Sequence, residues 1–203
     1  MDETGPPVNQ TMYRGITGSL LYLTASRPDI VFSVGLCARF QSNPKESHLK
    51  TAKRILRYLK ATQDLVLYYP SDDSFNLIGY ANANCAGYLM DRKSTFGMAH
   101  FLGSCLFSWG TRKQNLVPLS IAEAEYVAAT SYCAQLLWIK QQLEDFGVLT
   151  ESVTLLCDNT GALNMTKNPI QHKRTKHIDV RHHFLRDNVE KGLICMKFCS
   201  TKD

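Results

Sequence analysis

The pattern of apolar residues changes once along this 203-residue chain, and the change limits the folds it can adopt. Up to about residue 60 the apolar residues recur at intervals of three and four, which predicts helices. From residue 75 onward, short strand-like runs alternate with longer helical patterns. The turn-rich residues 70–74, P-S-D-D-S, separate the two regions. We therefore predict a small helical segment over residues 1–70 and a second domain over residues 71–203.

The first region is expected to contain three helices. Asn9 or Thr11 can cap the first helix, which runs to Leu23, and Pro28 opens a second that ends near Phe40. From residue 47 a third helix carries apolar residues on one face and cations on the other. A solvated helix face is the simpler interpretation of those cations. In the alternative, the face follows nucleic-acid phosphates, with Lys53 and Arg57 among the contacts.

The second region alternates strands and helices. The expected strands cover residues 75–81, 97–102, 105–109, 153–157 and 194–199. The expected helices cover residues 120–146, a short stretch ending at residue 167, and residues 177–191. Residues 116–119 could add a strand, although Pro118 argues for an edge, and Gly103–Ser104 suits a type II′ hairpin turn. This order predicts an α/β domain with a mixed five-stranded sheet flanked by helices.

Composition limits the cellular locations that are expected for such a chain. Its apolar runs fall short of the ~20 residues that a membrane span requires. The first three residues, M-D-E, are acidic where a signal peptide would be basic, so we expect an intracellular protein of the cytoplasm or nucleus with no membrane contact. Seven scattered cysteines without a C-x-x-C motif predict buried free thiols rather than disulfides or zinc ligands.

Two carboxylates are notable for their positions. Glu125 falls in the first turns of the helix that begins at residue 120, and Asp158 follows an apolar strand. The ends of such strands are where ligand groups converge in α/β sheets. Taken alone, each has a simpler interpretation: Glu125 as an acid that complements the helix dipole and Asp158 as a turn residue.

Longer motifs around these acids resemble one family. Residues 120–126, S-I-A-E-A-E-Y, are similar to the copia ribonuclease H helix motif S-T-A-E-A-E-Y, and residues 156–159, L-C-D-N, to its Y-C-D-N. Residues 173–184 resemble R-T-K-H-I-D-I-R-Y-H-F, and residues 91–95 match D-R-K-S-T. Residues 13–23 and 54–60 resemble the segment after the reverse transcriptase core. From about residue 13 onward the chain looks like the C-terminal end of a copia-type retrotransposon Pol polyprotein.

The resemblance implies a ribonuclease H-like fold preceded by the thumb- or connection-like end of the reverse transcriptase. It also implies hydrolysis of the RNA strand of RNA/DNA hybrids by two Mg²⁺ ions that four carboxylates hold. Glu125 and Asp158 match the second and third of these catalytic metal ligands. The family's first acid lies in G-Y-S-D-A-D-W-A-G, where residues 79–87 read G-Y-A-N-A-N-C-A-G, so Asn82 replaces it and Asn84 replaces the next acid. The fourth belongs to a D-Q-L-A-D segment past residue 203, so we expect a domain without its last helix.

A basic segment supplies the expected nucleic-acid contacts. Residues 167–191 hold seven Lys or Arg against three acids, which is +4 of the net +5. The residues expected to grip backbone phosphates are Lys173, Arg174, Lys176 and Arg181. A solvated basic turn and helix is the alternative. The histidines at 177, 182 and 183 are not assigned to a metal, because Mg²⁺ avoids imidazole.

The expected function is therefore binding of an RNA/DNA hybrid or other nucleic acid by a degenerate ribonuclease H-like chain that is catalytically inactive. In one alternative the chain is an active Mg²⁺-dependent hybrid nuclease, in which Asp72 or Asp91 could substitute for Asn82. In the other it is a non-enzymatic interaction scaffold. Surface that the polyprotein normally covers could also favour self-association.

Overall fold

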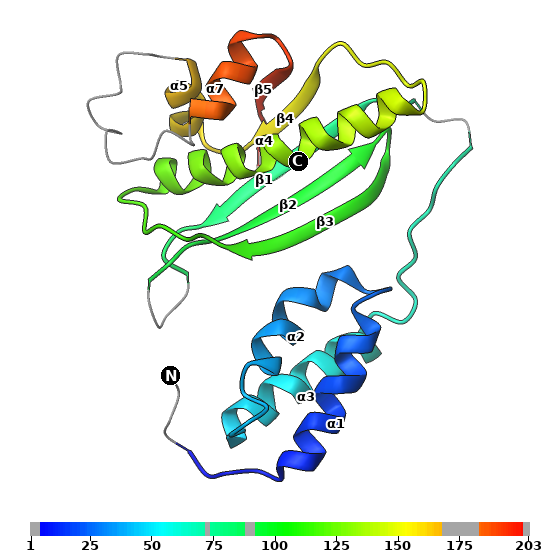
Figure 1. The fold of residues 1–203 in the computed structure, drawn as a ribbon, viewed down its shortest axis with the longest axis vertical. Helices are drawn as coiled ribbons and strands as arrows, with labels where there is room; N and C mark the ends of the chain where they lie inside the picture. The colour runs from blue at the N-terminus through cyan, green and yellow to red at the C-terminus, as the bar shows by residue number, and fades with distance from the viewer. Residues whose placement is uncertain (1–4, 72–73, 88–91, 168–182, 201–203) are drawn as a thin grey trace. The chain divides into compact units, whose positions relative to one another are not determined.

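The computed structural model describes residues 5–71, 74–87, 92–167 and 183–200 (Figure 1). The chain divides into two compact units, Met1–Leu67 and Tyr68–Asp203. Each unit has its own buried apolar core, so each is described separately.

The described residues of the first unit form three α-helices, as the periodicity predicts. These are α1 (Gln10–Leu23), α2 (Val31–Ala38) and α3 (Glu46–Ala61), with a short 3₁₀ turn, η1 (Pro28–Ile30), ahead of α2. The Asn9 side chain caps α1 by accepting a hydrogen bond from the Met12 N–H at 2.9 Å. The apolar faces of the helices meet in a core that contains Tyr13, Leu20, Val34 and Ile55.

The second unit is a mixed five-stranded sheet with flanking helices. Its strands are β1 (Leu77–Asn84), β2 (Thr95–Leu102), β3 (Cys105–Lys113), β4 (Val153–Cys157) and β5 (Ile194–Phe198), in the order β3-β2-β1-β4-β5. The first three strands pair antiparallel, whereas β4 runs parallel to both β1 and β5. The described helices are α4 (Ile121–Asp145), α5 (Thr160–Lys167) and α7 (His183–Glu190). The predicted fold class is confirmed.

Helix α4 lies across one face of the sheet and packs against β1 (Figure 1). The Ser120 hydroxyl caps it by accepting a hydrogen bond from the Glu123 N–H at 3.2 Å, at the residue where the predicted helix over residues 120–146 begins. Gly79 allows close contact with α4, because a Cβ there would lie 2.6 Å from the Tyr132 ring. Leu163 of α5 and Leu185 of α7 join the same core, so these helices pack on the α4 side of the sheet.

Several details of the second unit differ from expectation. Strand β1 continues three residues beyond the predicted end at Ala81, because β2 pairs with it as far as Asn84, and β3 likewise extends to Lys113. The suggestion of a strand at residues 116–119 is wrong, since that stretch is irregular and Pro118 offers no backbone donor. Its Leu119 N–H instead bonds to the Glu123 carboxylate at 2.7 Å. Gly103 has a φ of 61°, as a two-residue hairpin turn requires.

Candidate functional site

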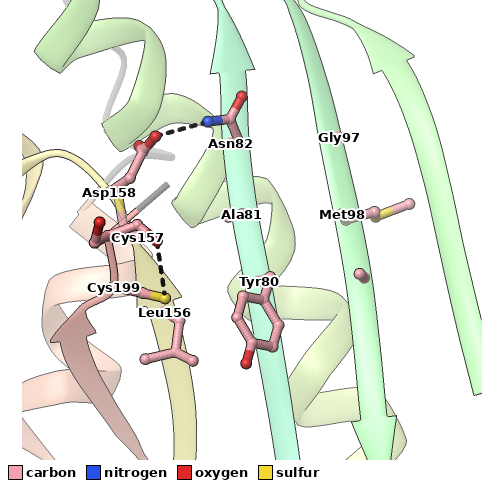
Figure 2. Close-up of a pocket in the computed structure, with 11 residues that line it drawn as sticks. Tyr80, Ala81, Asn82, Gly97, Met98, Leu156, Cys157, Asp158 and Cys199 are labelled. Atoms are coloured by element: carbon pink, nitrogen blue, oxygen red, sulfur yellow. Dashed lines mark hydrogen bonds between the residues drawn. The ribbon is translucent and has the colours of Figure 1, made fainter. Parts of the chain in front are cut away.

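Neighbouring parallel strands bring Asn82 and Asp158 together. The β1–β4 register pairs Ala81 with Cys157, so the next residue on each strand lies at the same edge of the sheet. The Asn82 Nδ2 donates a hydrogen bond to Asp158 Oδ2 at 3.0 Å (Figure 2). Asn82, which the sequence resemblance places at the family's first acid, is therefore a neutral donor that bonds to Asp158.

Glu125 reaches the same place from α4. Strand β4 ends opposite Ala81, so the Ala83 N–H lies beyond the end of that parallel ladder. Glu125 Oε1 accepts a hydrogen bond from this N–H at 2.8 Å. Its side chain is only 3% exposed, and its other oxygen, Oε2, is buried without a hydrogen-bond partner among the described residues.

Burial controls the protonation of Glu125. Desolvation raises the pKa of this carboxyl from 4.5 to about 7, the Ala83 N–H bond partly opposes the rise, and the nearby charge of Asp158 adds to it. No described cation offsets this effect. Glu125 is therefore a group that can hold or release a proton near neutral pH.

Sequence reasoning missed the third member of this cluster, Cys157. Three ligand atoms, one from each residue, lie within 4.8 Å of one another in the cluster of Glu125, Cys157 and Asp158. Cys157 is 1% exposed, and burial raises the pKa of its thiol to about 11, with the charges of Glu125 and Asp158 adding to the rise. The signal available in the sequence was its position directly before Asp158 at the strand end.

A hollow opens beside the cluster on the face of the sheet away from α4. Its volume is about 270 Å³, and its lining includes Tyr80, Asn82, Met98, Leu156, Asp158 and Cys199 (Figure 2). Most of this lining is apolar, and Asn82 and Asp158 are among the residues that supply its polar groups. Water and ligands can reach that edge from the hollow.

Only two of the cations that are expected to bind nucleic acid lie within the described residues. Lys53 and Arg57 are exposed on α3, where they line a shallow hollow of about 420 Å³ together with Lys50 and Leu56. Lys50 also pairs with Glu46 at 3.2 Å. The remaining expected phosphate contacts and the possible substitute acids lie outside the described residues: Lys173, Arg174, Lys176, Arg181, Asp72 and Asp91.

The sheet order and the carboxylates beside β1 define the class. The mixed sheet has the order β3-β2-β1-β4-β5, and acids from α4 and from the end of β4 converge on β1. Such a domain is ribonuclease H-like. No helix in the described part of the chain is long and apolar enough to cross a bilayer.

Sequence comparison then gives the family. The chain is 39% identical over 194 residues to the "Retrovirus-related Pol polyprotein from transposon RE1" of Arabidopsis thaliana, covering 95% of this chain and 13% of that protein. It is 38% identical over 192 residues to the corresponding polyprotein from transposon TNT 1-94 of Nicotiana tabacum, covering 94% and 14%. No family model matches. The chain belongs to the Pol polyproteins of copia-type retrotransposons and spans 13 to 14% of these relatives' length.

Solved structures agree on the fold. A foamy viral protease-reverse transcriptase with double-stranded DNA matches with a TM-score of 0.62 at 13% identity, covering 98% of this chain and 36% of that one. A second foamy viral structure, with an RNA/DNA hybrid, matches with a TM-score of 0.53 at 12% identity, covering 98% and 26%. At such identities the likeness shows the fold alone.

The ribonuclease H-like family generally depends on metal, and the resemblance implies two Mg²⁺ ions, but the residues beside β1 do not fit that pair. Two Mg²⁺ ions require several anionic oxygens in near-octahedral geometry. Among the described residues the cluster offers two carboxylates, a thiol and an amide whose N–H already engages Asp158. The described residues therefore do not supply the ligands that a two-magnesium reaction requires.

Proposed function

We propose that this chain is a nucleic-acid-binding module of retrotransposon origin whose ribonuclease H-like site does not cleave RNA. In this proposal residues 71–203 form the ribonuclease H-like domain and residues 1–70 the C-terminal segment of the reverse transcriptase. The observation that carries the proposal is the hydrogen bond from the Asn82 amide to Asp158. A neutral donor occupies the position where the family's chemistry needs an anionic acceptor.

The energetic consequence is large. A unit charge about 4 Å from another contributes about 4 kcal/mol at an effective dielectric of 20, and more against a divalent ion. Each ~1.4 kcal/mol of lost transition-state stabilisation lowers a rate tenfold. The Asp-to-Asn difference at position 82 alone thus accounts for several orders of magnitude in rate, and Glu125 and Asp158 remain as a vestige of the catalytic set.

Nucleic-acid binding needs positive charge and no metal. Lys53 and Arg57 lie one helical turn apart on an exposed face of α3, a spacing that suits successive contacts with a phosphate backbone. The proposal adds Lys173, Arg174, Lys176 and Arg181 as further phosphate contacts. The foamy viral relative in fold was solved with an RNA/DNA hybrid, which supports a hybrid as the first partner to test.

The test is binding and cleavage of a labelled RNA/DNA hybrid in Mg²⁺ or Mn²⁺, with the natural chain compared to Asn82→Asp. We expect the natural chain to bind without cleavage. Cleavage that Glu125→Gln abolishes would refute the inactive assignment and favour an active nuclease. If the natural chain neither binds nor cleaves the hybrid, the result would favour a protein-interaction scaffold. Such a scaffold would self-associate through the open sheet face, where Tyr80 is 39% exposed.

A salt titration tests the basic face of α3 separately. Replacing Lys53 and Arg57 by Ala should weaken hybrid binding and reduce the slope of log affinity against log salt by roughly one for each phosphate that the chain no longer neutralises. Arg39→Ala is the matched control, because Arg39 is an exposed cation in the same unit but lies after α2. Equal effects of the control and the double substitution would refute a specific role for α3.

A further inference from the structure

We propose that two copies of this chain associate by adding residues 65–69 of each copy, L-V-L-Y-Y, as a strand to the edge of β3 in the other. The surface differs from the open sheet face considered above, because it is a side edge of the sheet and uses backbone hydrogen bonds. The inference does not rest on nucleic-acid binding, and its test contains no nucleic acid, so the two proposals can fail separately.

Residues 65–69 form an uninterrupted run of exposed apolar and aromatic side chains between α3 and β1. Their exposed fraction alternates, with 84% at Val66 and 79% at Tyr68 against 47% at Leu67 and 55% at Tyr69. A period of two is the pattern of an extended chain, and Val and Tyr favour strands. The structure nevertheless assigns no strand to this run. An extended, apolar and uncharged stretch of this kind is suited to pair with a strand edge.

Strand β3 offers an edge of matching chemistry. It is last in the sheet order, and within the described residues the sheet pairs it only with β2. One row of its backbone N–H and C=O groups therefore faces away from that ladder. Residues 105–111 carry no charge and include Leu106 and Trp109. Charged side chains commonly protect such edges, and β3 has them only at its end, at Arg112 and Lys113.

A hydrogen bond already links the segment to this edge. The Tyr69 hydroxyl donates to the backbone oxygen of Leu106 at 3.2 Å, so this part of the edge is open to a partner. Antiparallel pairing that keeps Tyr69 near Leu106 would set Asp64, five positions earlier, close to Arg112. Both charged side chains are exposed. Their opposite charges favour the antiparallel direction, because cross-strand pairs of opposite charge stabilise a sheet.

A second copy is the partner that the chain itself supplies. Within one copy the segment reaches β3 through the Tyr69 side chain and forms no strand. Each copy carries both the segment and the edge, so two equal contacts can form around one two-fold axis. Aromatic side chains bury about 150–250 Å² each, so Tyr68 and Tyr69 of two copies supply on the order of 500 Å² at their present exposures. The surface covered on β3 and the three aliphatic side chains bring the total toward the roughly 1,200–2,000 Å² of a stable interface.

Sedimentation velocity of the full chain over a roughly hundredfold range of concentration tests this proposal. We expect an equilibrium between monomer and dimer. Neighbouring N–H groups of a strand point to opposite sides, so one of Val66→Pro and Leu67→Pro removes a donor from the ladder and should weaken the dimer about tenfold or more. Asp64→Lys should also weaken the dimer. The double variant Asp64→Lys/Arg112→Asp should restore it, because opposite charges then meet again.

Leu149→Pro is the matched control, because Leu149 is as exposed as Val66, at 84%, and lies in an irregular stretch after α4. It should leave the dimer unchanged, and so should Tyr80→Ser on the open sheet face. A natural chain that stays monomeric with a native far-ultraviolet spectrum would overturn the proposal. So would a dimer that survives both proline variants, equal weakening by Leu149→Pro, or dissociation of the dimer by Tyr80→Ser in a chain that remains folded.

Discussion

Replacing Glu125 by Gln should stabilise the folded chain, by an amount that grows with pH. Burial raises the pKa of Glu125 from 4.5 to about 7, so between these values the folded chain holds a proton that the unfolded chain has released. The free energy of unfolding therefore falls as pH rises through this window, and it stays lower above pH 7. At about 1.4 kcal/mol per pH unit, the total loss is about 3 kcal/mol.

The neutral amide of Gln avoids this loss. Its oxygen can still accept the Ala83 N–H bond, so the contact between α4 and β1 is retained. We expect Glu125→Gln to exceed the natural chain in stability by less than about 1 kcal/mol at pH 5 and by about 3 kcal/mol at pH 8. Urea denaturation at four pH values between these limits, in the presence of a chelator, measures the difference.

Glu151→Gln controls for the removed charge, because Glu151 lies on an exposed loop between α4 and β4. Its effect should stay within about 0.5 kcal/mol at every pH. A difference in the free energy of unfolding between the natural chain and Glu125→Gln that stays constant from pH 5 to pH 8 would refute this prediction. It would show that burial does not raise the pKa of Glu125.

Two further stability predictions concern the packing of α4 on the sheet. Gly79→Ala should cost about 1–3 kcal/mol in urea denaturation, because its Cβ would lie 2.6 Å from the Tyr132 ring, whereas Gly97→Ala on β2 enters open space and should be close to neutral. An equal cost for both glycines would contradict this. Burial lowers the pKa of His100, which stacks on Tyr132, so the unfolded chain binds a proton that the folded chain refuses as pH falls below about 6.5. His100→Phe should therefore gain stability relative to the natural chain between pH 7 and pH 5, and a constant difference in urea midpoint would contradict this.

Local signals predicted much of the fold. Ser120 with Glu123 marks the start of α4, and the apolar run before Asp158 marks β4, because capping and strand periodicity act over a few residues. The end of β1 was harder to predict. Asn82 and Asn84 have low strand propensity, and pairing with β2, up to Asn84 opposite Thr95, holds them extended.

The site was predictable only through its acids. Motif resemblance identified the positions of Glu125 and Asp158, but it carries no information on how far the side chains are buried. Cys157 looked like one more buried thiol, because its closeness to Glu125 depends on how α4 packs on the sheet. The bond from the Ala83 N–H to Glu125 Oε1 likewise depends on β4 ending opposite Ala81, a tertiary detail that no local pattern encodes.

We expect the parallel pairing of β1 with β4 to form late in folding. Strands β1 to β3 are joined by short connections and can pair early, whereas Asn82 and Asp158 are separated by 76 positions. Contacts between such distant residues carry a larger loop-closure entropy and slow folding. The hydrogen bond between these two residues should therefore be among the last to form as the chain folds. The site beside β1 would then exist only in molecules whose sheet is complete, and a folding intermediate with β1 to β3 alone would lack it.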